Sequence, residues 1–209
     1  MLPAYLAERF PPHVFVPLAI IVAAAATGGV WGGPRTLAND FVLALLLLAQ
    51  YRIWDDLADR HLDRIAHPSR VLVRAESTTS AIALGVALAA ASLSVVLVRD
   101  GAGLSLATLI GLTGLLSAWY TWRGSRTTAG DHLLLTKYPA IVVIVSGDRI
   151  AHRLAFALCT MVAVYLAACV YEAWHDPSSP ASGHPLLVAC EAIIFILVSI
   201  AAWSLGGHS

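Results

Sequence analysis

Charged residues are scarce in this sequence. They make up 12% of the 209 residues, whereas soluble domains carry about 25%. Hydrophobic residues account for 58%, and the mean hydropathy is +0.76. Basic and acidic residues number thirteen each, so the formal net charge is zero and there is no basic excess of the kind that binds nucleic acid. This composition disfavours a soluble domain and predicts no nucleic-acid partner, with membrane lipids as the expected surroundings.

Cysteine is also scarce. The three cysteines, Cys159, Cys169 and Cys190, all lie inside apolar runs, and their spacing matches no metal-binding motif. Buried free cysteines usually behave as small apolar side chains. We therefore predict that all three are packing residues and not disulfide partners or metal ligands.

The alternating pattern of a transmembrane β-barrel is absent, and long apolar runs take its place. Several runs reach the ~20 residues that a membrane-spanning helix needs, and helices satisfy their own backbone hydrogen bonds, as lipid requires. The sequence predicts an all-α polytopic membrane protein, a single domain over residues 1–209, with about seven transmembrane helices bundled around a central cavity. The predicted spans are 14–30, 37–54, 79–98, 103–122, 132–147, 153–174 and 185–205.

Lysine and arginine are distributed unequally between the two sides that seven spans define. Nine lie on the side of the N-terminus and of the loops after the second, fourth and sixth spans, and four lie on the other side. Basic residues are enriched on the cytoplasmic side of membrane proteins. We therefore expect the N-terminus and these loops to face the cytoplasm, in a membrane of the bacterial inner-membrane type.

Residues 50–74 (QYRIWDDLADRHLDRIAHPSRVLVR) concentrate charge directly after an apolar run. Four aspartates, Asp55, Asp56, Asp59 and Asp63, follow the pattern D-D-x-x-D-x-x-x-D. On a continuous helix, Asp56, Asp59 and Asp63 fall on one stripe of the surface, where like charges repel. Mg²⁺ removes this cost because it binds carboxylate oxygens, and it usually completes its shell with water and substrate phosphates. The pattern predicts a phosphate or diphosphate ligand held through Mg²⁺.

Basic residues around the acidic stretch fit the same ligand. Arg52 lies one turn before Asp56, and Arg70 follows the last aspartate. Arginine binds phosphate oxygens in a bidentate manner. An alternative is an ordinary charged segment in which aspartate and arginine pair at helical spacing, as Asp56 and Arg60 do. The residues of this stretch leave both interpretations open.

Two more candidates belong to the predicted cytoplasmic side. Lys137 interrupts the fifth span, and a lysine inside a membrane costs about 2.5–3.5 kcal/mol, so it is a functional candidate unless it snorkels to the surface. Glu172, His175 and Asp176 share one helical face at the end of the sixth span. They form a second, weaker candidate site for metal or diphosphate.

Three polar residues within the spans have less specific interpretations. Asn39 and Asp40 lie near the start of the second span and are interpreted as helix N-terminal caps. Glu191 is embedded in the seventh span. It either faces the same cavity as Lys137 or pairs with an interior polar group.

The acidic stretch resembles the first aspartate-rich motif of the UbiA superfamily of intramembrane prenyltransferases. The residues that carry the resemblance are 54–63 (WDDLADRHLD) and the following His67-Pro-Ser-Arg70. Residues 5–10 (YLAERF) and 137–139 (KYP) are also similar to that family. The family's second aspartate motif follows the sixth span, where this chain has Glu172, His175 and Asp176.

The resemblance implies a UbiA-like enzyme that uses Mg²⁺ to transfer a prenyl group from a polyprenyl diphosphate to an acceptor within the membrane, through ionisation of the allylic diphosphate. The Mg²⁺ ligands it implies are Asp55, Asp56, Asp59, Asp63, Glu172 and Asp176. The implied catalytic residues are Asp56, Asp59 and Lys137, and the implied substrate-binding residues are Arg52, Arg70, Arg126, Lys137 and Tyr138. Two alternatives stay open. Seven spans and a short second motif also fit a non-catalytic truncated homologue that binds an isoprenoid diphosphate or a partner. The embedded Lys137 and Glu191 also fit a small transporter.

Overall fold

The computed structural model describes residues 1–30, 32–99, 101–176 and 179–206. All regular secondary structure in these ranges is helical. The elements are α1 (Leu2–Arg9), α2 (Pro12–Ala26), α3 (Pro34–Ala58), α4 (Arg60–Ala66), α5 (Val71–Arg74), α6 (Thr79–Leu97), α7 (Ala102–Trp122), α8 (Thr128–Leu135), α9 (Lys137–Ser146), the 3₁₀ helix η1 (Gly147–Arg153), α10 (Leu154–His175), the 3₁₀ helix η2 (Pro180–Gly183) and α11 (Pro185–Gly206). The prediction of an all-α protein is confirmed.

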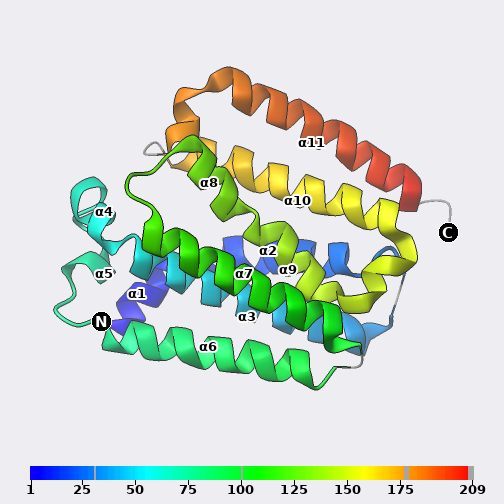
Figure 1. Cartoon of the computed structure of the whole chain (residues 1–209), viewed down its shortest axis with the longest axis horizontal. Helices are drawn as coiled ribbons and strands as arrows, with labels where there is room; N and C mark the ends of the chain where they lie inside the picture. The colour runs from blue at the N-terminus through cyan, green and yellow to red at the C-terminus, as the bar shows by residue number, and fades with distance from the viewer. Residues whose placement is uncertain (31, 100, 177–178, 207–209) are drawn as a thin grey trace.

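The long helices run side by side along the long axis of the molecule (Figure 1). Helix α3 packs between α2 and α6, and α9 packs against α2, α7 and α10. Helix α11 covers the outer side of α10. Helices α1, α4 and α5 gather at one end, together with the start of α8 (Figure 1). We call this end the α1/α5 end, and the one with η1 and the α6–α7 turn the η1 end.

The core lies where α2, α3, α7 and α9 meet. The buried residues of α3 follow a helical spacing, as Leu43, Ala44, Leu47 and Tyr51 show. A second, smaller cluster holds α1 and α5 against the end of α3. This second cluster fixes the N-terminal helix beside the acidic stretch.

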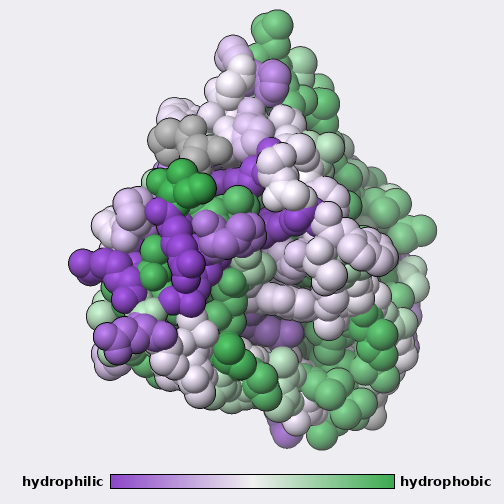
Figure 2. Space-filling model, turned by 60° about the vertical axis from the view of Figure 1, so that its left-hand side comes forward, coloured by the Kyte–Doolittle hydropathy of each residue, from purple (hydrophilic) through white to green (hydrophobic). Residues whose placement is uncertain are grey.

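The outer surface of the long helices is apolar. Helix α11 exposes Ile193, Ile196, Ile200 and Trp203, which would be unfavourable in water but suits lipid. Figure 2 shows apolar surface along the flank and hydrophilic surface gathered toward one side of the same face. This distribution is that of an integral membrane protein.

Within the described ranges, five helical segments are long and apolar enough to cross a membrane, and the count rises to six if the bent pair α1 and α2, which meet at 63°, forms one span. The segment Thr128–His175 counts once among the five, although it contains α8, α9, η1 and α10. The chain reverses direction at η1, so α9 and α10 run side by side in opposite directions (Figure 1). Gly147 opens this turn with a φ of +58°, which few residues other than glycine adopt.

Two local predictions have definite outcomes. The interruption of the fifth span near Lys137 is confirmed, because α8 ends at Leu135 and α9 begins at Lys137. The interpretation of Asn39 and Asp40 as N-terminal caps is wrong. Helix α3 begins at Pro34, a residue whose fixed φ suits the first turn, so both residues lie inside the helix.

Asp40 has a different role from capping. Its carboxylate is completely buried and accepts hydrogen bonds from Arg149 Nη2 at 2.8 and 2.9 Å and from Arg99 Nη2 at 2.8 Å. These arginines lie after α6 and in η1. The Asp40 cluster therefore ties three segments together at the η1 end, far from the acidic stretch.

Candidate functional site

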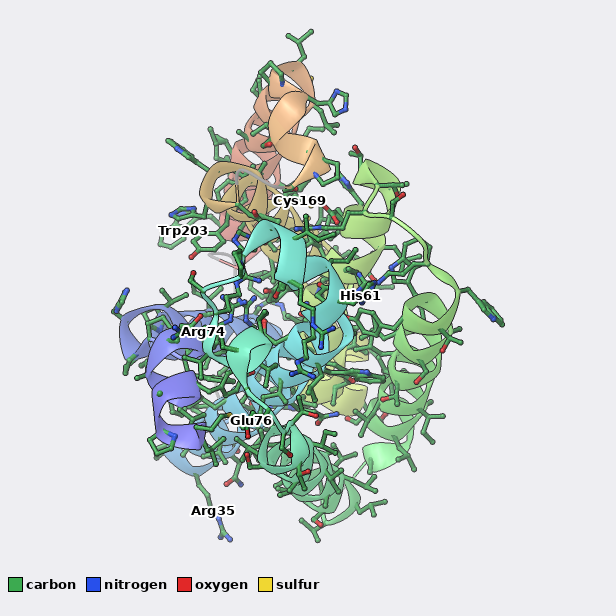
Figure 3. The ribbon with its side chains drawn as sticks, turned by 90° about the vertical axis from the view of Figure 1, so that its left-hand side faces the viewer. Arg35, His61, Arg74, Glu76, Cys169 and Trp203 are labelled. Atoms are coloured by element: carbon green, nitrogen blue, oxygen red, sulfur yellow. The ribbon has the colours of Figure 1, made fainter. Side chains whose placement is uncertain are left out.

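The acidic stretch lies at the α1/α5 end, where α3, α7 and α10 end and α8 begins. Figure 3 looks onto this end, with His61 of α4 and Arg74 of α5 toward the viewer. Helix α3 stops at Ala58 and α4 starts at Arg60, so the helix is not continuous through the aspartates. The four aspartates consequently divide between two sides instead of forming one stripe.

Asp56 faces the N-terminal helix. Its Oδ2 accepts hydrogen bonds from the Tyr5 hydroxyl at 2.9 Å and from Arg9 Nε at 3.0 Å, and its Oδ1 accepts one from Arg9 Nη2 at 2.6 Å. Arg52 Nε lies 3.6 Å from the same Oδ1, which makes an ion pair within α3. The predicted pairing of Asp56 with Arg60 does not form, because the Arg60 guanidinium donates to the carbonyls of Leu72 and Ala75.

Asp63 lies on the same side as Asp56. Arg70 Nη1 donates to Asp63 Oδ2 at 2.5 Å. Both aspartates line a small pocket with Tyr5, Arg9 and Arg70. Nearby, Glu8 accepts a hydrogen bond from the backbone N–H of Val71 at 2.9 Å, which fastens the start of α5 to α1.

Asp55 and Asp59 face the opposite side, toward α7 and α9. Asp55 accepts hydrogen bonds from Lys137 Nζ and from the Tyr120 hydroxyl. Asp59 accepts one from Arg123 Nη2, directly after α7. Lys137 is buried and its ammonium is ion-paired, so it does not snorkel to the surface. Tyr138 follows Lys137 in α9, and its ring centroid lies 5.5 Å from the Lys137 Nζ.

The second predicted cluster forms around Arg126. Its guanidinium contacts Asp176 Oδ2 at 3.0 Å, Glu172 Oε1 at 3.3 Å and Asp131 Oδ1 at 3.4 Å. Asp131 is buried and also accepts from the Ser179 hydroxyl at 3.0 Å. Gly130 allows this arrangement, because a Cβ on it would lie 2.5 Å from the Trp119 ring. His175 takes no part, since its Nδ1 bonds the Tyr171 carbonyl and its ring stacks on Tyr171.

Three cations connect the two acidic clusters. Arg52 and Lys137 both interact electrostatically with Glu172, although their nearest acidic partners are Asp56 and Asp55. Arg126 interacts in the same way with Asp59 as well as with the acids around it. The first and second predicted motifs therefore lie around a common set of basic side chains.

Burial and charge alter the acid–base properties of two groups in the connecting segments. Burial raises the pKa of Asp59 above its usual value, although the charge of Arg123 opposes this rise. Burial acts to lower the pKa of Arg126, but Asp131, Asp176 and Glu172 outweigh it and raise that pKa. Arg126 is therefore a permanent positive charge within the second cluster.

The donor set of the acidic stretch suits Mg²⁺, because every candidate ligand is a hard carboxylate oxygen. Asp59 uses Oδ1 for Arg123 and Asp63 uses Oδ2 for Arg70, so each retains an oxygen with accepting capacity. The aspartates do not converge, however. Among the described residues, the one group of three potential ligands with ligand atoms within 4.8 Å of one another is His132, Cys169 and Glu191, outside the acidic stretch.

Several residues of the site lie outside the sequence-based prediction. Tyr5 and Arg9 bind Asp56, and Tyr120 and Arg123 bind Asp55 and Asp59. The resemblance of residues 5–10 to the UbiA superfamily is the signal that pointed toward Tyr5 and Arg9. Tyr120 and Arg123 follow an apolar run of no particular pattern, and nothing in their spacing indicates an acidic partner more than sixty residues away.

Comparison with known proteins identified no relative of this chain. No protein-family model, curated protein or solved structure matches the chain. The assignment of function therefore depends on the chemistry of the side chains at the α1/α5 end and on the motifs of the sequence itself.

Proposed function

We propose that this chain is a Mg²⁺-dependent membrane prenyltransferase related to the UbiA superfamily. It transfers a prenyl group from a polyprenyl diphosphate to an acceptor inside the membrane. In this proposal the chain crosses the membrane seven times, with α8 and α9 together forming the fifth span and α10 the sixth. The α1/α5 end then faces the cytoplasm, in agreement with the excess of basic residues there.

The observation that supports this proposal best is the set of cations between two acidic clusters. Arg52, Arg126 and Lys137 each interact with an aspartate of the acidic stretch and with Glu172 of α10. A diphosphate needs cations around its oxygens, and the bound Mg²⁺ needs carboxylates. In the described part of the chain, the Nε atoms of Arg52 and Arg123 are buried and have no hydrogen-bond partner, so a bound phosphate oxygen would supply the missing acceptor.

The charge of the site also favours a metal–diphosphate complex over diphosphate alone. The site contains seven acidic and six basic side chains in mutual contact and is close to neutral. Diphosphate by itself would make the site strongly negative. Mg²⁺ ions held by the two pairs of aspartates, Asp56 with Asp63 and Asp55 with Asp59, and by Glu172 and Asp176 would offset that charge and polarise the leaving diphosphate.

The roles of the other residues follow from their positions. Ionisation of the allylic carbon–oxygen bond moves negative charge onto the leaving diphosphate, and Lys137, Arg52 and Arg126 stabilise that charge. Arg70 and Tyr138 contribute further contacts to the substrate. The apolar helices surround the prenyl chain and exclude water, which would otherwise capture the allylic cation.

The test is Mg²⁺-dependent consumption of a prenyl diphosphate by the purified full chain. Asp56→Ala and Asp59→Ala should each lower the rate at least a hundredfold, because each removes a metal ligand. Asp148→Asn serves as the matched control, since this exposed aspartate lies in η1 at the other end of the molecule. Full activity in both aspartate variants, or activity that withstands a chelator, would refute the proposal.

One observation favours a second candidate, a non-catalytic homologue that binds an isoprenoid diphosphate. Each of the four aspartates of the acidic stretch already has an arginine or lysine partner in the chain. Metal binding must displace or share these partners, which lowers the gain from binding. Saturable binding of a prenyl diphosphate with no prenylated or cyclised product by mass spectrometry would support this candidate over the enzyme.

A further inference from the structure

A compact group of three side chains lies beside the second acidic cluster, and none of the three belongs to the proposed Mg²⁺ site. His132 comes from α8, Cys169 from α10 and Glu191 from α11. One ligand atom from each, a ring nitrogen, a thiol sulfur and a carboxylate oxygen, lies within 4.8 Å of the others. Cys169, labelled in Figure 3, and Glu191 are buried, and His132 is partly buried. The three residues lie far apart in the sequence, so only the packing of the helices brings them together.

The hydrogen bonds of His132 show that a proton or a metal cation is needed between its Nε2 atom and the Glu191 carboxylate. Nδ1 lies 2.8 Å from the carbonyl oxygen of Thr128, and a carbonyl only accepts, so Nδ1 must carry the hydrogen. Nε2 lies 2.6 Å from Glu191 Oε1. A neutral imidazole would direct a lone pair at a carboxylate there. Either a second proton or a metal cation must therefore lie between them.

Glu191 provides an independent indication of a ligand. Its second oxygen, Oε2, is buried and has no hydrogen-bond partner among the described residues. A buried carboxylate oxygen without a partner costs more than an ordinary lost hydrogen bond. A proton shared between His132 and Oε1 does not satisfy Oε2, whereas a cation bound by the carboxylate can interact with both oxygens.

We propose that His132, Cys169 and Glu191 form a zinc-binding site with an open fourth position. One nitrogen, one sulfur and one oxygen ligand are a combination that Zn²⁺ accepts in tetrahedral geometry, and a water molecule commonly completes a three-ligand site. Thiolate is a soft ligand, so the group selects Zn²⁺ over the Mg²⁺ proposed for the acidic site. The Nδ1–H bond to the Thr128 carbonyl is the outer contact that orients a metal-bound histidine.

The fit requires small adjustments only. Zinc bond lengths place tetrahedral ligand atoms about 3.3–3.6 Å apart, so His132 Nε2 and Glu191 Oε1 would separate by about 1 Å. The other ligand atoms already lie within 4.8 Å. Tyr165 packs edge-on against the His132 ring, with centroids 6.4 Å apart, and limits rotation of the imidazole.

Zinc at this position would link α11 to the rest of the protein. Helix α11 packs mainly on α10 and η2, and much of its apolar surface is exposed. The site would join it to α8 and α10 close to Glu172, one turn after Cys169. This proposal does not depend on the proposed prenyltransferase function.

The experiment uses the purified full chain, stripped of metal with a chelator and then titrated with Co²⁺ in excess Mg²⁺. The wild-type protein should bind one equivalent, with visible bands typical of tetrahedral cobalt and a near-ultraviolet band from thiolate-to-metal charge transfer. Zn²⁺ should displace the cobalt and raise the melting temperature. Carboxylate ligands alone give no charge-transfer band, so the acidic site cannot mimic this signal.

Variants then assign the ligands. Cys169→Ser should abolish the charge-transfer band, and His132→Ala and Glu191→Gln should each weaken cobalt binding at least tenfold. Cys159→Ser and Cys190→Ser are the matched controls and should retain the wild-type spectrum. A wild-type protein that binds no stoichiometric Co²⁺ or Zn²⁺ overturns the proposal whether or not the variants fold. A band that persists in Cys169→Ser, or that either control also loses, overturns it as well.

Discussion

Variants of the buried ion pair between Lys137 and Asp55 should affect the stability of the protein and its activity differently. Their side chains are 9% and 14% exposed, so both charges lie largely out of water. Lys137→Met keeps the length of the side chain but leaves Asp55 with the Tyr120 hydroxyl as its remaining hydrogen-bond donor among those described. Removing one partner of a buried ion pair costs about 3–5 kcal/mol, and the Tyr120 bond favours the lower end of that range.

A loss of about 3 kcal/mol corresponds to a fall in melting temperature of roughly 6–12 °C for a chain of this size. The double variant Asp55→Asn with Lys137→Met should recover most of this loss, because replacing a buried pair by neutral side chains is often close to neutral. The assay is thermal unfolding of the purified protein in detergent. Arg64→Met, at an exposed position in α4, is the control and should melt within about 2 °C of wild type.

Activity should behave differently from stability in the same series. If Asp55 binds Mg²⁺ and Lys137 stabilises charge on the leaving diphosphate, the double variant regains its melting temperature but remains inactive. A double variant that is no more stable than Lys137→Met alone would show that the two charges are not energetically coupled. A stable double variant with full prenyltransferase activity would remove both Asp55 and Lys137 from the proposed mechanism.

Two further predictions concern residues that the tertiary structure revealed. Asp40→Asn leaves Arg99 and Arg149 without their buried carboxylate and should lower the melting temperature by roughly 6–12 °C. The control Asp148→Asn, at the same end of the molecule, should change the melting temperature little. Equal melting curves for the two variants would contradict this account. Tyr5→Phe removes one hydrogen bond to Asp56 and should lower the free energy of unfolding by about 1 kcal/mol. It should also increase proteolysis of the N-terminal helix α1. Unchanged proteolysis would mean that this hydrogen bond does not hold α1 in place.

The long apolar runs made the helical fold predictable. The predicted span 79–98 matches α6 to within one residue, and the predicted span 37–54 lies inside the longer α3, because a backbone in lipid must satisfy its hydrogen bonds within the helix. The start of α3 was less predictable. Pro34 and Asp40 are both acceptable near a helix start, and local sequence does not distinguish a capping aspartate from one whose partners lie elsewhere.

The acidic site could be predicted in part. The residues on the predicted cytoplasmic side do gather at one end of the molecule, where Arg126 meets both Glu172 and Asp176 as well as the neighbouring Asp131. The prediction that Asp56, Asp59 and Asp63 share one stripe did not hold, because α3 ends at Ala58. A break of one residue turns the following helix, and helical periodicity cannot anticipate it.

Glu191 had two possible roles from the sequence, a cavity-facing acid or one member of an interior pair. The structure pairs it with His132, fifty-nine residues away. The same contact changes the interpretation of Cys169, which the sequence marked as a packing residue. Its apolar neighbours in the chain gave no indication of the histidine and carboxylate that helix packing brings beside it.

The sequence by itself determined that this is a helical membrane protein with its charge concentrated at the helix ends, because hydropathy and charge are local properties of the chain. Only the tertiary structure decided which charges meet. Asp40 pairs with Arg149, which is 109 residues away in the sequence, and Asp56 pairs with Arg9, which is 47 residues away. In a low-dielectric interior each charge must find a partner, and the choice among distant partners depends on how the apolar faces of the helices pack.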